Sequence, residues 1–191
     1  AGTPVNWVRR TTMTAPITAL PHSGAGMARH SYPNGGTGAF SSETIATPSF
    51  DLSGRGTNTV PFSFWIYRDS LMPNNNDSIS IYVNTTTSLS GATLIGTVAR
   101  SRTINIPDTK AINGWYQYTF NIPSQFSGST NYVMLKGTCY GPSNTARRIY
   151  VDDVEWTSYP PACNGSPVGG NLSAGTSTFC GGVGNTTLTR N

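Results

Sequence analysis

Two adjacent aspartates, Asp152 and Asp153, stand in the segment "RRIYVDDVEW", which otherwise alternates like a β-strand. Side chains of a strand alternate between two faces, so at most one carboxylate points into an interior unless a β-bulge intervenes. A carboxylate that points inward needs a cation or hydrogen-bond donors. Two interpretations are therefore open: a metal ligand, or a carboxylate that accepts backbone N–H bonds or pairs with Arg147 or Arg148.

The residue inventory offers little support for catalysis. A Ser-His-Asp hydrolase would need His22 or His30 as its base, and neither lies near a nucleophile elbow. Both histidines belong to a Gly- and Ser-rich stretch that we expect to face solvent. Paired carboxylates for glycoside hydrolysis would have to come from eight acidic residues, several of which lie at expected strand ends. We predict that the chain is not an enzyme.

The three cysteines are Cys139, Cys163 and Cys180, and their spacing is not that of a zinc site. A disulfide between Cys163 and Cys180 would close a short loop in a Gly-rich region, which indicates an oxidising, extracellular environment. Cys139 would then be a small buried residue.

The elements that carry these residues are predicted to be β-strands, because the apolar residues alternate with a period of two and no stretch shows helical spacing. The alternating segments, each bounded by Gly, Pro or Asn, are "TVPFSFWIYRD", "DSISIYVNT", "ATLIGTVAR", "GWYQYTFNI", "NYVMLKGTCY" and "RRIYVDDVEW". Short strands separated by turn signals predict an all-β antiparallel sandwich.

Charge and hydropathy exclude two classes of partner. The net charge is +4, but only Arg9-Arg10 and Arg147-Arg148 are adjacent basic pairs, and the lysines are Lys110 and Lys136 alone. A nucleic-acid surface needs basic residues gathered on one face or in a run, so no nucleic-acid partner is expected. No segment approaches the roughly 18 apolar residues of a membrane helix, so no membrane span is expected.

Aromatic side chains matter because exposed rings stack on sugars and on protein surfaces. The tryptophans within apolar strands are expected in the core, and these are Trp65, Trp115 and Trp156. The aromatic residues nearer to loops are the predicted ligand-binding residues, and these are Trp7, Tyr32, Tyr140 and Tyr159.

A change in composition divides the chain after Pro160-Pro161. Beyond this point aromatic residues nearly vanish, and the remaining segment is too small and too polar to form a core. We expect one sandwich domain over residues 1–159 and a Gly- and Ser-rich C-terminal extension over residues 160–191.

The order of the segments resembles the MAM domain, and more closely the MAM-like jelly-roll domains of large secreted or surface-displayed proteins of Bacteroidetes-type bacteria. The matching pieces run from "SGAGMA" at 23–28 through "TPSFDLSG" and "FWIYRD" to "IYVDDVEW" at 149–156. The resemblance implies a jelly roll of two antiparallel sheets without catalytic residues. The extension is similar to the opening of the Ig-like modules that follow such domains, in which case Cys180 would pair with a cysteine beyond residue 191.

The resemblance also implies site chemistry. In such jelly rolls an acidic residue of the last strand often helps to hold a structural Ca²⁺, which makes Asp152 and Asp153 the expected metal ligands. Animal MAM domains carry an acidic residue in the early loop, and His22 stands at that position here. The sequences "DSL" and "DSI" are similar to periplasmic O-glycosylation sites of the same bacteria and would place glycans on Ser70 and Ser78.

Two functions follow as expectations. The first is a non-catalytic binding or adhesion module of a secreted, cell-surface protein that recognises a glycan or a surface protein. The second is a structural building block of a surface polymer or filament, in which the extension docks onto a neighbouring copy of the chain. An accessory domain of a secreted enzyme is a third possibility.

Overall fold

The computed structural model describes residues 7–14, 18–31, 40–71, 76–140 and 148–161, and these ranges contain nine β-strands and no helix. No helix that is long and apolar enough to cross a membrane therefore occurs among them. In chain order the strands are β1 (Trp7–Arg10), β2 (Met27–Ser31), β3 (Phe40–Ala46), β4 (Val60–Arg68), β5 (Ser78–Asn84), β6 (Thr93–Ala99), β7 (Gly114–Ile122), β8 (Tyr132–Tyr140) and β9 (Arg148–Trp156).

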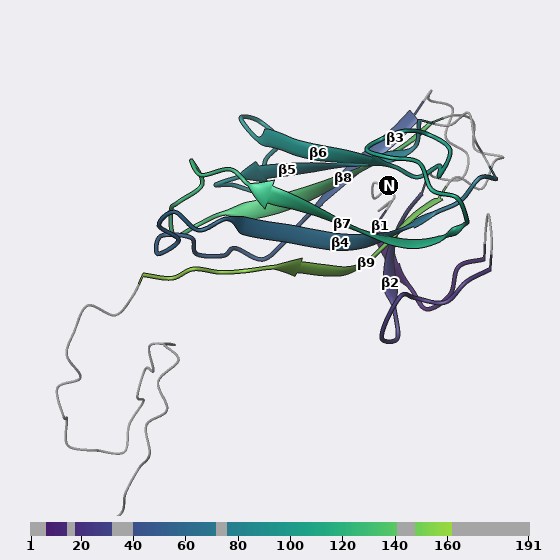
Figure 1. Cartoon of the computed structure of the whole chain (residues 1–191), viewed down its shortest axis with the longest axis horizontal. Coiled ribbons are helices and arrows are strands. Elements are labelled where there is room, and N and C mark those ends of the chain that lie inside the picture. The colour runs from purple at the N-terminus through teal and green to yellow at the C-terminus, as the bar shows by residue number, and fades with distance from the viewer. Residues whose placement is uncertain (1–6, 15–17, 32–39, 72–75, 141–147, 162–191) are drawn as a thin grey trace, which may run out of the picture.

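The strands form two antiparallel sheets that pack face to face (Figure 1). One sheet has five strands in the order β1-β2-β9-β4-β7, and the other has four in the order β3-β8-β5-β6. Strands far apart in sequence are neighbours, as where β2 pairs with β9. The predicted all-β sandwich is confirmed, and the six segments recognised by alternation correspond to β4 to β9.

The core lies between the inner faces of the two sheets. Phe62, Phe64 and Ile66 of β4 point inward and are fully buried, and β5 contributes Ile79 and Ile81 in the same way. Burial of such side chains is the main stabilising contribution, on the order of 1.5–3 kcal/mol each. Cys139 is also buried in this core, as expected.

A second apolar cluster covers part of the outer face of the five-stranded sheet. It consists of Met13, Met27, Tyr67 and Tyr150, with Ala19 and Trp115 packed against it. The Met13 N–H donates to the Ala19 carbonyl at 2.8 Å, so the segment before β2 folds back over the sheet. We call the described residues 18–25 of this segment the covering segment.

Buried ion pairs fix the connections at one end of the sandwich. Arg100 is 1% exposed and donates from Nη1 to Asp69 Oδ2 at 2.8 Å and from Nε to Asp77 Oδ2 at 3.3 Å. Buried charges need such partners because desolvation of an isolated ion is costly. Asp69 and Asp77, the residues directly before Ser70 and Ser78, are thus structural residues.

Candidate functional site

A β-bulge decides where the two adjacent aspartates point. Asp152 pairs with Trp65 and Glu155 pairs with Ser63, so β9 uses one residue more than β4 between these two pairs. The extra residue is Asp153, whose φ of 43° lies in the left-handed region that Asp tolerates better than most residues. A bulge of this kind changes the alternation of the strand.

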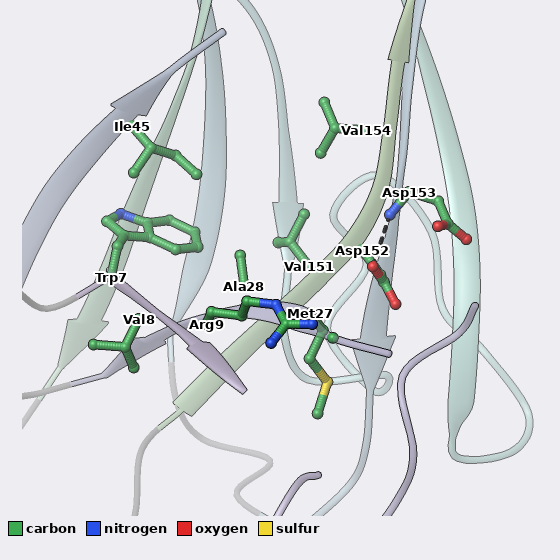
Figure 2. Close-up of a pocket in the computed structure, with 11 residues that line it drawn as sticks. Trp7, Val8, Arg9, Met27, Ala28, Ile45, Val151, Asp152, Asp153 and Val154 are labelled. Carbon is green, nitrogen blue, oxygen red and sulfur yellow. Dashed lines mark hydrogen bonds between the residues drawn. The ribbon is translucent and has the colours of Figure 1, made fainter. Parts of the chain in front are cut away.

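The bulge places both carboxylates on the same side of β9. Figure 2 shows Val151 and Val154 pointing toward Trp7, whereas the carboxylates of Asp152 and Asp153 point away from it. Asp152 lies on the outer face of the five-stranded sheet, beside the covering segment. Neither aspartate therefore points into the core between the sheets.

Donors from His22 and Ser23 satisfy these carboxylates. The His22 N–H donates to Asp152 Oδ2 at 2.8 Å, with a longer contact of 3.4 Å from the Ser23 N–H. The Asp153 N–H donates to Asp152 Oδ1 at 3.0 Å. His22 Nδ1 lies 2.6 Å from Asp153 Oδ2, and the Ser23 hydroxyl donates to Asp153 Oδ1. All four carboxylate oxygens thus have partners, including backbone N–H groups, as the second interpretation of the sequence had it.

These contacts favour the charged form of Asp153. The hydrogen bond from the Ser23 hydroxyl, followed by the one from His22, lowers the pKa of Asp153 below its ordinary value. The other expected partner of the aspartates is engaged elsewhere, since Arg148 donates from Nη1 to Thr14 Oγ1 at 2.8 Å. Arg147 lies outside the described residues.

This arrangement does not fit a calcium site. Calcium needs six to eight oxygen ligands, whereas N–H and O–H donors surround Asp152 and Asp153 here. His22, which stands where animal MAM domains carry an acidic residue, supplies two of these contacts. Among the residues that the structure describes, no three His, Cys, Asp or Glu side chains are grouped as a metal site. Calcium stays a prediction to be tested.

An aromatic stack borders the aspartates. The His22 ring lies on Trp65 with 3.6 Å between centroids and 16° between planes, and Trp115 meets His22 edge-on at 6.1 Å. Trp65 and Trp115 are half-buried on the outer face, which corrects the expectation that they belong to the core. Strand alternation indicates the outward position of Trp65, because Phe64 and Ile66 occupy the opposite face of β4. Trp156 packs against the main core as expected.

A polar row crosses the outer face next to this stack. Ser63 of β4 lies directly between Thr119 of β7 and Glu155 of β9. Ser63 Oγ is 3.5 Å from Glu155 Oε2 and 3.4 Å from Gln117 Nε2, distances that are long for hydrogen bonds. Glu155, Gln117 and Thr119 are exposed. Their hydrogen-bonding groups are therefore available to a ligand.

The row borders a hollow of about 400 Å³ that is lined by Pro61, Ser63, Thr119, Glu155, Trp156 and Thr157. We call this hollow, together with Gln117, the outer-face hollow. Sequence reasoning did not identify it, because its polar residues come from three strands and have no spacing of their own. The sequence does indicate which residues of each alternating strand are polar and face outward, but it does not indicate which strands lie side by side.

A second, apolar groove lies along the seam between β1, β2, β9 and β3. It measures about 370 Å³, and Figure 2 shows its lining, including Trp7, Ala28, Ile45 and Val151. Trp7 is only 7% exposed, and its indole N–H donates to the Glu43 carbonyl at 2.9 Å. This corrects the expectation that Trp7 lies on an exposed binding surface, because its ring is buried between the two sheets.

The other predicted ligand-binding residues do not come together. Tyr140 is 40% exposed and pairs with the first residue of β3. Tyr159 lies beyond the other end of β3, where its N–H donates to the Asp51 carbonyl at 2.6 Å, and it packs against the core. Tyr32 lies outside the described residues, as do Cys163 and Cys180.

The two serines proposed for glycosylation differ in their surroundings. Ser78 belongs to β5 and pairs with Ala99 on one side and Thr138 on the other. Ser70 follows β4, and its N–H donates to Asn113 Oδ1 at 3.2 Å. Glycosylation of either serine stays a prediction.

His30 differs from the sequence expectation. It lies in β2, not in an exposed loop, and is fully buried with its ring 5.2 Å from the ring of Trp7. The ring occupies the space above Gly137, where a Cβ atom would come within 2.5 Å of it. Burial lowers the pKa of His30 to about 4, although Ser41 and the charge of Glu43 oppose this.

Comparisons with known proteins point to a fold. No family model matches the sequence, and no curated protein matches it. The K1 cleaved adhesin domain of Lys-gingipain from Porphyromonas gingivalis W83 is similar in structure, with a TM-score of 0.50 and 20% identity over 82% of this chain and 93% of that one.

Two further structures are less similar. The K3 cleaved adhesin domain of the same gingipain has a TM-score of 0.45 and 19% identity over 81% of this chain and 92% of that one. The module CBM27-1 of Caldicellulosiruptor saccharolyticus, solved with mannohexaose, has a TM-score of 0.43 and 15% identity over 72% and 77%. At such identities, the likeness to the K1 domain shows a shared β-sandwich fold and nothing more.

Proposed function

We propose that this domain is a non-catalytic binding module that recognises a glycan on the outer face of its five-stranded sheet. The observation that carries the proposal is the outer-face hollow, in which Gln117, Ser63, Thr119 and Glu155 gather on three adjacent strands. We also propose a secreted or cell-surface location, in keeping with the resemblance to MAM-like domains.

The chemistry of the hollow suits sugar hydroxyl groups. The Gln117 amide both donates and accepts, the Ser63 and Thr119 hydroxyls do the same, and the Glu155 carboxylate accepts from two hydroxyls at once. Sugar rings also need an apolar surface, and Pro61 and Trp156 in the lining of the hollow supply one.

Binding is favoured over hydrolysis by the number of carboxylates. A glycosidase needs two carboxyl groups that flank the scissile bond, and the lining of the hollow supplies only Glu155. Asp152 and Asp153, which lie on the same side of β9, both accept hydrogen bonds from His22 and Ser23 of the covering segment. The site thus has a hydrogen-bonding surface without a second catalytic carboxylate.

A glycan array followed by titration calorimetry tests the proposal. The variants Glu155→Gln and Gln117→Ala should each weaken binding about tenfold, as expected when a hydrogen bond to a charged or neutral partner is lost at a binding surface. Gln125→Ala is the matched control, because Gln125 is an exposed glutamine in a loop after β7.

Two results would contradict glycan recognition. One is the absence of binding to any glycan on the array together with self-association in size-exclusion chromatography, which would favour the building-block function. The other is glycan binding that both hollow variants leave unchanged, which would place the site elsewhere on the domain.

A further inference from the structure

Three arginines from three adjacent strands form a diagonal row on the outer face of the five-stranded sheet, with Arg29 between Arg10 and Arg148. Arg29 of β2 lies directly between Val8 of β1 and Tyr150 of β9. Arg10 is two residues further along β1 than Val8, and Arg148 is two residues before Tyr150. Arg29 is therefore the diagonal neighbour of both other arginines, at the roughly 7–8 Å typical of such pairs.

Their positive charges are not neutralised within the part of the chain that the structure describes. The ion pairs found there involve His22, Arg68, Arg100 and Lys110. Arg148 donates to the neutral Thr14 hydroxyl, and Arg29 Nε is buried without a hydrogen-bond partner. Burial lowers the pKa of Arg29, and the charges of Arg10 and Arg148 add to this effect. Like charges held together in this way favour an anionic ligand.

The sequence shows only scattered pairs of basic residues. The pair Arg9-Arg10 is far from the pair Arg147-Arg148 in the sequence. The order of the sheet brings their strands, β1 and β9, to either side of β2. One arginine from each of these pairs, Arg10 and Arg148, therefore lies beside Arg29 in the folded sheet. Arg147 itself lies outside the described residues.

We propose that Arg10, Arg29 and Arg148 form an anion-binding patch that selects carboxylated or sulfated polysaccharides, an inference that rests on the proposed glycan-binding function. Guanidinium groups bind carboxylate and sulfate oxygens through paired hydrogen bonds. The patch and the outer-face hollow lie on the same sheet face, near the two ends of β9. Arg148 and Glu155 are seven residues apart along this strand, one of which is the bulge residue, so the span is about 20 Å, which a polymer crosses and a single sugar does not.

The surroundings of the patch favour a polysaccharide over a nucleic acid. Single-stranded nucleic acids stack their bases on exposed aromatic rings beside basic grooves. The aromatic residues nearest to the patch in the sheet are Tyr150 and Tyr67, which are 2% and 8% exposed. They are covered by Met13 and Met27, so the patch offers charge without a stacking surface.

The test compares four probes by biolayer interferometry: polygalacturonate, dextran sulfate, neutral dextran and a DNA duplex. We expect the two acidic polysaccharides to bind, and to bind more weakly as salt rises between about 50 and 200 mM. Arg10→Gln and Arg148→Gln should each weaken binding about two- to fivefold, and together by roughly tenfold. Melting curves establish that the variants are folded.

Lys136→Gln is the matched control. It removes one positive charge from β8, where Lys136 pairs with Thr44 and Ser80 on the outer face of the other sheet. This control should change affinity by less than either arginine variant. An equal effect would mean that net charge, not the patch, governs binding, and would overturn the proposal.

The remaining outcomes separate this proposal from the proposed function. If neutral glycans bind through Glu155 and Gln117 but acidic polymers show no preference, the patch has no role while the binding function stands. If no polysaccharide binds, both fail. Tighter binding of the DNA duplex, with the same dependence on Arg10 and Arg148, would replace the polysaccharide with a nucleic acid.

Discussion

His22 Nδ1 lies 2.6 Å from Asp153 Oδ2, and the same imidazole stacks on Trp65 with 3.6 Å between ring centroids. The two contacts fasten the covering segment to the bulge of β9 and to the sheet at once. Trp65 pairs with Gln117 in the sheet, so the stack lies beside the polar row.

Asp153→Asn should destabilise the domain by about 1 kcal/mol, because it keeps a residue that tolerates positive φ but removes a charge-assisted hydrogen bond. The folded-state pKa of Asp153 is lowered, so its contribution is present above the ordinary pKa of 3.8 and is lost as pH falls through the folded-state value. Chemical denaturation at neutral and acidic pH checks this. A variant as stable as the wild type at neutral pH would contradict it.

Removal of calcium should leave the melting temperature unchanged, since donors occupy every oxygen of Asp152 and Asp153. The measurement is a melting curve with EDTA and one with added CaCl₂. A ligand that binds only the native state must raise the melting temperature. A calcium-dependent rise that Asp152→Asn abolishes would restore the metal interpretation.

Acid should destabilise the domain through His30. Below about pH 6.5 the unfolded chain binds a proton on this imidazole, whereas the folded chain does so only near pH 4. Stability therefore falls as pH drops from 6.5 to 4, by about 3 kcal/mol at most from this group. His30→Leu removes the titrating ring, so its stability should depend less on pH in this window. Parallel pH profiles for the two proteins would show the idea to be wrong.

Gly54→Ala should loosen the segment that follows β9. A Cβ atom on Gly54 would come within 2.1 Å of the Pro160 carbonyl oxygen, which forces the backbone apart at a cost of about 1–3 kcal/mol. Faster limited proteolysis near residues 158–161 checks this. Gly128→Ala is the control, because its Cβ meets no atom within 4 Å. Equal cleavage of both variants would argue against the close approach.

Asp77→Asn should be the most damaging of these substitutions, at about 3–5 kcal/mol, because it breaks a fully buried ion pair with Arg100. Asp77 also accepts the Tyr140 N–H at 2.8 Å. Asp51→Asn serves as the comparison, since among the described residues the Asp51 carboxylate bonds only Ser53, and this substitution should cost much less than Asp77→Asn. Similar denaturation midpoints for the two variants would be the contrary result.

The sequence was informative where alternation alone decides the structure. The strands β4 to β9 follow from it. The outward position of Trp65 was available from its alternation with Phe64 and Ile66, but Trp65 was wrongly expected in the core because it lies in an apolar strand. A single extra residue is invisible to the same reasoning, because a bulge at Asp153 leaves the composition of the strand unchanged. His30 was misplaced in a loop because its Gly- and Ser-rich neighbours hide a five-residue strand.

Features that join distant segments were beyond reach of the sequence. Arg10, Arg29 and Arg148 become neighbours only once the order β1-β2-β9 is known. The covering segment is equally hidden, because its small and polar residues carry no periodic signal. Its two roles, capping Asp152 and stacking on Trp65, depend on the pairing of β9 with β4.

The bulge at Asp153 reverses which residues of β9 face the core. Before it, odd-numbered residues such as Val151 face the core, and after it even-numbered ones such as Val154 and Trp156 do so. If a related chain lacked that one residue, the side chains in the rest of β9 that face the core here would face solvent, and those that face solvent would face the core. Sequence alignments of such chains should therefore align the residues before Asp153 separately from those after it, because odd-numbered residues face the core in the first part and even-numbered ones in the second.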